Sequence, residues 1–274
     1  MKNWLKDRWV VVTGASSGIG RELCKLLLEK YQVKVLGVGR DETKMLTLIG
    51  ELSQTAKENF VYRLFDVSVK ESWGLLKIYL DERGIVPALI VNNAGVFPSF
   101  SRFQNSETLE KTMQVNFYSA VYCAEVFLSA MKASDLPVGL LNVSSSAALC
   151  PVVGTTAYSA SKCALKGFTH ALSLEQKKNV YVGAVFPGTT ATELFKQNES
   201  LTDSGLIEKL ATKPQTMAKK ILKVALRRKK YAVLGIDAKL MNFVATVAPV
   251  KGSGMIRNIM KKFGANYFNG IFDE

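Results

Sequence analysis

This sequence has almost no histidine and no closely spaced pair of cysteines. Its 274 residues include one histidine, His170, and four scattered cysteines without a CxxC pair. Zinc sites need several such ligands at short spacings, so we expect no metal centre. Cysteines that are far apart in the sequence are typically reduced thiols rather than disulfides, which indicates a cytoplasmic protein.

Long apolar segments and linkers are missing as well. The first eight residues are too polar for a signal peptide, and the stretch 240–250, which contains Asn242 and Pro249, is too short to span a bilayer. With 48% hydrophobic and 22% charged residues, the chain can bury a sizeable core. We therefore expect one main domain, 1–235, with a basic C-terminal extension, 236–274, packed on it.

Acidic residues are scarce in one part of the chain. Between Leu206 and Lys262 there are 14 Lys or Arg but only two acids, Glu208 and Asp237, so this segment carries +12 of the net charge of +13. One interpretation of 209–262 is helices packed on the body with solvated lysine ends. The other is a membrane-associated protein, with a surface for an anionic membrane or for an acidic carrier of the substrate. No recognition motif supports nucleic-acid binding, and we expect none.

Apolar runs alternate with helical patterns along the chain. Helices are predicted between the runs, one of them over 41–57, and further helices over 216–230 and 255–263. This alternation predicts an α/β, Rossmann-like fold, a doubly wound and mainly parallel sheet with helices on both faces. Ligands of such sheets bind at the carboxyl ends of the strands. The runs predicted as strands are 9–12, 33–38, 60–67, 88–92, 139–144, 181–186 and 231–235.

A glycine-rich turn, 13–20, lies between the first predicted strand and the first helix. It reads TGASSGIG, with the spacing G-x-x-x-G-x-G, one residue wider than the common dinucleotide fingerprint. Glycines let a diphosphate approach the backbone, and the helix N-terminus supplies N–H groups and the positive end of a dipole. The turn therefore predicts nucleotide binding through Gly14, Ser16, Ser17, Gly18, Ile19 and Gly20.

The same turn also fits a different class of protein. Gly14-Ala15-Ser16-Ser17-Gly18 matches the G-x-S-x-G elbow of serine hydrolases, with Ser16 as the nucleophile. That hypothesis needs a histidine base, and His170 is predicted within a helix, where a structural role is the better interpretation. A serine hydrolase stays as one alternative, and a non-catalytic nucleotide-binding or membrane-surface module stays as another.

Arg40 follows the second predicted strand, twenty residues after the last glycine of the turn. At this position of dinucleotide folds an acid binds the ribose 2′-hydroxyl, whereas an arginine accommodates a 2′-phosphate. Asp41 and Glu42 are expected to open the next helix, where acids suit the dipole. Arg40 therefore predicts NADP(H) rather than NAD(H) as the cofactor.

Tyr158 and Lys162 are spaced as neighbours on one face of a helix. A nearby ammonium favours the phenolate, so we expect the tyrosine pKa to fall below its usual value of ~10. Such a tyrosine can donate or accept a proton near neutral pH. No other tyrosine in the sequence has a lysine four residues later.

These motifs, with several others in the same order, resemble those of the short-chain dehydrogenase/reductase family. The resemblance covers about 8–195 and includes the glycine turn, the NNAG sequence at 92–95 and the YxxxK pair. It implies that Asp66 holds the adenine of the cofactor and that Thr192 contacts the nicotinamide carboxamide. The full set of cofactor contacts that it implies outside the glycine turn is Arg40, Asp66, Val67, Asn93, Ala94, Gly95, Tyr158, Lys162, Pro187, Gly188 and Thr192.

The resemblance also implies a catalytic set of Asn116, Ser145, Tyr158 and Lys162. Ser145 would hydrogen-bond the substrate carbonyl oxygen, and Tyr158 would deliver or remove the proton on it. Lys162 would lower the tyrosine pKa and hold the nicotinamide ribose, while Asn116 would link the lysine to solvent through a water. Ser144 is the adjacent alternative to Ser145, and strand alternation would point the two in opposite directions.

The predicted activity is hydride transfer between NADP(H) and a carbonyl/alcohol pair. The loop 96–103, with Val152, Val153 and Phe195, predicts a fairly large apolar pocket. We therefore expect reduction of a lipophilic ketone, either sterol-like or with an acyl chain. A homodimer through the helices near Asn116 and Tyr158 is the expected assembly.

Overall fold

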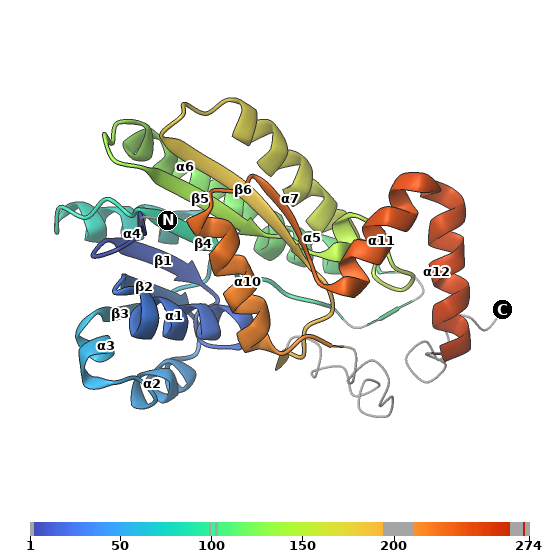
Figure 1. Cartoon of the computed structure of the whole chain (residues 1–274), viewed down its shortest axis with the longest axis horizontal. Coiled ribbons are helices and arrows are strands. Elements are labelled where there is room, and N and C mark those ends of the chain that lie inside the picture. The colour runs from blue at the N-terminus through green and yellow to red at the C-terminus, as the bar shows by residue number, and fades with distance from the viewer. Residues whose placement is uncertain (1–2, 99, 102–103, 194–210, 264–270, 272–274) are drawn as a thin grey trace.

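The chain folds around one parallel sheet of seven strands, seen in the computed structural model of Figure 1. The structure describes residues 3–98, 100–101, 104–193, 211–263 and 271. The strands are β1 (Trp9–Thr13), β2 (Lys34–Gly39), β3 (Phe60–Leu64), β4 (Leu89–Asn92), β5 (Val138–Val143), β6 (Val180–Pro187) and β7 (Tyr231–Leu234). The longer helices are α1 (Gly18–Tyr31), α2 (Glu42–Gly50), α3 (Gln54–Glu58), α4 (Lys70–Asp81), α5 (Ser106–Met113), α6 (Ser119–Lys132), α7 (Thr156–Leu174), α10 (Pro214–Leu226), α11 (Ile236–Val247) and α12 (Pro249–Phe263).

The strand order is β3-β2-β1-β4-β5-β6-β7, and every neighbouring pair is parallel. The chain adds strands in one direction up to β3 and in the other direction from β4 onward. The carboxyl ends of β1 and β4 therefore frame the crevice at which ligands of such sheets bind.

Helices cover both faces of the sheet, and β1 shows why. Val10 and Val12 are buried against a group of helices that includes α1 and α10, whereas Val11 is buried against a group that includes α4 and α6. Successive side chains of a strand point to opposite faces, so a fully apolar strand needs a cover on each. This arrangement confirms the predicted doubly wound α/β sheet.

The single helix predicted over 41–57 is wrong, because these residues form α2 and α3 with a break between them. α2 ends at Gly50. Ser53 then caps α3 by accepting a hydrogen bond from the backbone N–H of Ala56 at 3.3 Å. A serine side chain at this position starts a new helix rather than continuing the previous one.

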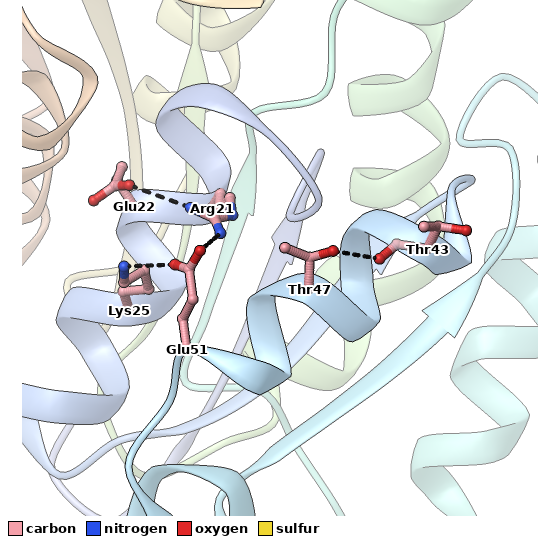
Figure 2. Close-up of polar contacts among 6 residues, drawn as sticks. All are labelled: Arg21, Glu22, Lys25, Thr43, Thr47 and Glu51. Atoms are coloured by element: carbon pink, nitrogen blue, oxygen red, sulfur yellow. Dashed lines mark hydrogen bonds and ion pairs between the residues drawn. The ribbon is translucent and has the colours of Figure 1, made fainter.

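Glu51, at the end of α2, fastens this helix to α1. Figure 2 shows its carboxylate between Arg21 and Lys25, with ion-pair distances of 2.5 and 2.9 Å. The guanidinium of Arg21 also lies 3.8 Å from Glu22. Although Arg21 lies near the glycine turn, these carboxylates already balance its charge. Arg21 is therefore a poor candidate for a phosphate ligand.

The C-terminal helices differ in part from the sequence prediction. α10 ends at Leu226, four residues earlier than predicted, and Arg228 takes a left-handed conformation with φ of 51° that does not continue a helix. α12 lies outermost at its end of the molecule, with α11 between it and the sheet (Figure 1). Among the described residues, no helix is both long and apolar enough to cross a membrane.

Candidate active site

The glycine turn leaves the start of α1 open to a ligand. Gly14 and Gly18 have positive φ angles of 66° and 52°, a region that favours glycine. A Cβ on Gly20 would collide with the carbonyl oxygen of Gly14. Ser17 caps α1 without a side-chain hydrogen bond, and no acid lies in the first helical turn. The N–H groups and the dipole of α1 are therefore available to an anion, which fits the diphosphate of a dinucleotide.

Thr13 and Asn93 join β1 to β4 beside this turn. The Thr13 hydroxyl accepts hydrogen bonds from the backbone N–H groups of Asn93 and Ala94 at 3.0 and 2.9 Å. The side-chain amide of Asn93 donates to the Thr13 carbonyl at 2.9 Å. Asn93 therefore has a structural role of its own, and with Ala94 and Gly95 it also lines the central cavity.

Ser145 and Tyr158 meet at the carboxyl end of β5. Both side chains line the central cavity, Ser145 partly offsets the rise that burial causes in the pKa of Tyr158, and the Ser145 hydroxyl accepts a hydrogen bond from the N–H of Ala147 at 3.2 Å. The Ser144 hydroxyl instead donates to the backbone carbonyl of Lys162 at 3.1 Å. The two neighbouring serines thus point in different directions, and Ser145 is the one beside the tyrosine.

Lys162 is buried one helical turn from Tyr158, with its Nζ 5.8 Å from the centre of the tyrosine ring. It donates a hydrogen bond to the Val143 carbonyl at 3.1 Å. Burial lowers the pKa of Lys162 to about 8. Burial also raises the pKa of Tyr158, and the interaction with Ser145 only partly offsets this. The expected lowering of the tyrosine pKa is therefore wrong in this structure, because loss of solvent is the largest effect and Lys162 is not among the groups that shift this pKa.

Asn116 lies in a π-helical turn, Gln114–Tyr118, between α5 and α6. Its side chain accepts a hydrogen bond from the Val96 N–H at 2.8 Å and donates to the Val96 carbonyl at 2.9 Å. A Cβ on Gly95 would lie 3.1 Å from the Asn116 oxygen and 3.4 Å from the Lys162 Nζ. The glycine thus keeps the amide and the ammonium close together. Single π turns of this kind are frequent at functional sites.

Arg40 and Asp66 form an exposed ion pair of 3.2 Å at the ends of β2 and β3. Asp66 also accepts hydrogen bonds from the N–H and hydroxyl of Ser68 at 2.9 and 2.7 Å. Partial burial raises the pKa of Asp66, but the bonds from Ser68 and the charge of Arg40 hold it below its usual value. The Arg40 side chain is 66% exposed and can turn toward a phosphate. Val67 packs in the core, so only its backbone is available to a ligand.

Asp237 fixes the segment that follows β6. Its carboxylate accepts a hydrogen bond from the N–H of Thr189 at 2.6 Å and occupies the space that a Cβ on Gly188 would need. Further along this segment Thr192 approaches the glycine turn, since a Cβ on Gly18 would lie 3.1 Å from its methyl group. The predicted contact residues after β6 are thus held against α11 on one side and the turn on the other.

These segments surround a cavity of about 370 Å³. The glycine turn, Ser145, Tyr158 and Lys162 form a polar side. The Phe97 ring packs edge-on against Tyr158, with ring centres 4.8 Å apart. Such a cavity can bury an apolar molecule and hold its polar group beside the tyrosine. The apolar side is lined by Phe97, Phe100, Val152, Met241 and Ile256.

Some pocket predictions differ from the cavity lining. Val153 is not among the residues that line it. Phe195 and the loop positions 99 and 102–103 lie outside the described residues. Met241 and Ile256 were not predicted as pocket residues, because the helices that carry them were assigned to a separate extension. Asp237 was not predicted as a site residue either, and its only signal was its isolation as an acid in a basic segment.

The position of Ser16 argues against a serine hydrolase. Its hydroxyl lies at the end of β2, 3.2 Å from where a Cβ on Gly39 would be. His170 is exposed on α7, and the structure describes no hydrogen bond between it and Ser16. The proposed nucleophile therefore lacks its base.

A glycine turn and a cavity lined by a serine, a tyrosine and a buried lysine, at the carboxyl ends of a parallel sheet, define a dinucleotide-dependent oxidoreductase. The chain belongs to the short chain dehydrogenase family, whose model matches residues 8–202. This confirms the family predicted from the motifs, and the protein is an NAD(P)-dependent oxidoreductase that acts on small molecules.

Individual relatives agree with this family. The chain is 32% identical over 256 residues to 3-ketodihydrosphingosine reductase of Bos taurus, covering 88% of this chain and 75% of that protein. It is 31% identical over 203 residues to L-xylulose reductase of Caenorhabditis elegans, covering 72% and 77%. A putative gluconate dehydrogenase from Agrobacterium tumefaciens shares the fold, with a TM-score of 0.76, 20% identity and coverage of 88% and 99%.

Proposed function

We propose that the protein reduces a lipophilic ketone with NADPH, or oxidises the matching alcohol with NADP, and that Asn116, Ser145, Tyr158 and Lys162 carry out the proton chemistry. The observation that carries this proposal is that Ser145, Tyr158 and Lys162 line one cavity together with several large apolar side chains. The glycine turn, Arg40 and Asp66 would hold the cofactor, which supplies or accepts the hydride when bound.

Each catalytic side chain has a role that its surroundings support. The raised pKa of Tyr158 keeps its hydroxyl protonated at neutral pH, so it can donate a proton to the carbonyl oxygen during reduction. Ser145 would hydrogen-bond the same oxygen and orient it. Lys162, with a pKa of about 8, can exchange a proton with solvent near neutral pH. Asn116 lies close enough to the ammonium to position a water beside it.

Arg40 is proposed to select NADP(H) through the 2′-phosphate. Arg40→Gln is expected to weaken NADPH binding ~10-fold to ~100-fold, since charge-assisted hydrogen bonds to the phosphate are lost. NADH binding should change little. Fluorescence titration with both cofactors measures the two affinities.

The matched control is Arg83→Gln, which removes an arginine that is 46% exposed just beyond the end of α4. This variant should bind both cofactors like the parent protein. An equal loss of NADPH and NADH affinity in Arg40→Gln would show a structural role for Arg40 instead. No loss of NADPH affinity would contradict the NADP(H) preference.

The apolar side of the cavity supports a lipophilic substrate. Relatives are named for different substrates, 3-ketodihydrosphingosine and L-xylulose. The proposal of a lipophilic substrate therefore rests on the residues that line the cavity. For methyl ketones of increasing chain length, kcat/KM is expected to rise about 4-fold per methylene until the cavity is filled. NADPH oxidation measures this series.

Met241→Asn places an amide in the apolar wall and should flatten the chain-length series. Leu174→Asn, at a position that is 72% exposed at the end of α7, should leave it unchanged. A preference for short polar ketones would contradict the lipophilic substrate. Cofactor binding without turnover of any ketone or alcohol would instead indicate a non-catalytic module.

A further inference from the structure

The outward side of α11 carries a row of large apolar side chains. Ile236, Leu240, Phe243 and Val247 are 89%, 61%, 64% and 67% exposed, and Val250 at the start of α12 is 86% exposed. The spacing of the first four, i, i+4, i+7 and i+11, places them on one face of the helix. Single exposed apolar residues are normal, but a continuous row marks an interaction surface. We call these four residues the α11 stripe.

The opposite side of α11 is fully occupied by the protein. Ala238 is buried, Asp237 holds Thr189, and Met241 lines the cavity. The helix therefore packs against the body of the protein and, through Val244, against Gly252 of α12, and it leaves the α11 stripe in contact with solvent.

Positive charges gather beside the start of the α11 stripe. A surface groove between α10, β7 and α11 is lined by Ile236 together with five cations, and none of its lining residues is acidic. Asp237, the acid nearest in sequence, is engaged with Thr189. This surface therefore favours an anionic partner. The five cations, which we call the cationic groove, are Lys220, Lys223, Arg227, Lys229 and Lys239.

We propose that the α11 stripe and the cationic groove dock the protein on the surface of an anionic lipid bilayer. α11 would lie in the plane of the interface, with the stripe below the headgroups and the lysines at the phosphates. An apolar face flanked by Lys and Arg is the pattern that such helices use.

Other partners fit only part of this surface. A second copy of the chain in a two-fold contact would bring the cationic groove against itself, which is repulsive. An acidic carrier protein would balance the charge of the cations, but its acidic surface would offer no apolar region to cover the α11 stripe. A bilayer offers both the anionic headgroups and the apolar layer beneath them.

Docking would also bring the catalytic cavity close to the lipid. Met241 lines the cavity from the opposite side of α11, the helix that carries the stripe, so the cavity would lie one helix away from the bilayer. A substrate dissolved in the bilayer would then have a short path to Tyr158, a consequence that rests on the lipophilic substrate proposed above. The docking surface itself contains none of the catalytic or cofactor-binding residues.

Flotation with vesicles tests the proposal on the full chain. The protein is expected to float with vesicles of phosphatidylcholine and phosphatidylglycerol, less at high salt, and not with phosphatidylcholine alone. Leu240→Asn with Phe243→Asn should lower the partition coefficient at least about tenfold. Lys220→Gln and Lys223→Gln should each lower it about fivefold. The matched control, Leu46→Asn with Leu174→Asn, changes leucines that are 55% and 72% exposed elsewhere and should bind like the parent.

Cofactor binding, measured in every variant, shows that the fold is intact whether or not the ketone assay succeeds. A variant that fails to bind vesicles can therefore be distinguished from a protein that lacks the proposed ketone reductase activity. Absence of flotation with anionic vesicles overturns the proposal, and so does an equal loss in the control variant. Loss of a dimer in the α11 variants, without vesicle binding by the parent, would assign the stripe to a second copy. Binding of an acidic protein but no vesicle would assign the surface to a carrier.

Discussion

Replacing Tyr158 by phenylalanine is expected to lower kcat by ~10²-fold to ~10⁴-fold, the usual contribution of a positioned general acid. The change removes the hydroxyl of a tyrosine that lines the cavity but keeps the ring that packs against Phe97, with ring centres 4.8 Å apart. The fold and the cofactor site should therefore persist. Steady-state turnover together with cofactor titration separates the chemical step from binding.

Two further substitutions make this test specific. Tyr62→Phe removes the hydroxyl of a partly buried tyrosine far from the cavity, which donates to Glu42 at 3.0 Å, and kcat should not change. Ser145→Ala should also reduce kcat, whereas Ser144→Ala removes only a hydrogen bond to the backbone of α7 and should leave kcat close to the parent value. Full activity in Tyr158→Phe would contradict the proposed role of Tyr158 as the proton donor.

The strands of this fold were predictable because each is an apolar run that must be covered on both faces. Their parallel pairing followed from the alternation with helices, whereas their order in the sheet was seen only in the structure. Breaks within helices depended on single side chains and were harder to predict. The cap formed by Ser53 divides the predicted helix 41–57, and the conformation of Arg228 follows the early end of α10.

The glycine turn and the Tyr158–Lys162 pair were predictable from residue types at fixed spacings, whereas Asn116 and Ser145 were predicted only from the resemblance to the family. Their energetics were not predictable in the same way. The pKa of Tyr158 depends on burial by residues far away in the sequence, such as Phe97 and Ser145. The spacing of four residues predicts that the Lys162 ammonium lies near Tyr158. It does not predict how completely the tyrosine hydroxyl is buried away from solvent. The role of α11 and α12 in the cavity likewise appeared only once the chain was folded.

Lys162 connects catalysis to stability, and Lys162→Met is expected to stabilise the protein at pH 7 while lowering kcat by ~10²-fold or more. The ammonium is only 4% exposed, and burial lowers its pKa from 10.5 to about 8. The shift corresponds to at most about 3 kcal/mol of destabilisation at neutral pH. The variant leaves the Val143 carbonyl without this donor, which costs ~1–2 kcal/mol, so the net gain in the free energy of unfolding is roughly 1–2 kcal/mol.

The pH dependence identifies the origin of this gain. Below about pH 8 the lysine is charged in both the folded and unfolded protein, and the full cost of burial is present. Between about 8 and 10.5 the folded protein has lost the proton while the unfolded chain still binds it, so this cost disappears as the pH rises. The advantage of Lys162→Met should therefore shrink over this range in thermal or denaturant unfolding. A constant advantage at all pH values would mean that methionine stabilises the protein through packing and that the buried charge is not the cause.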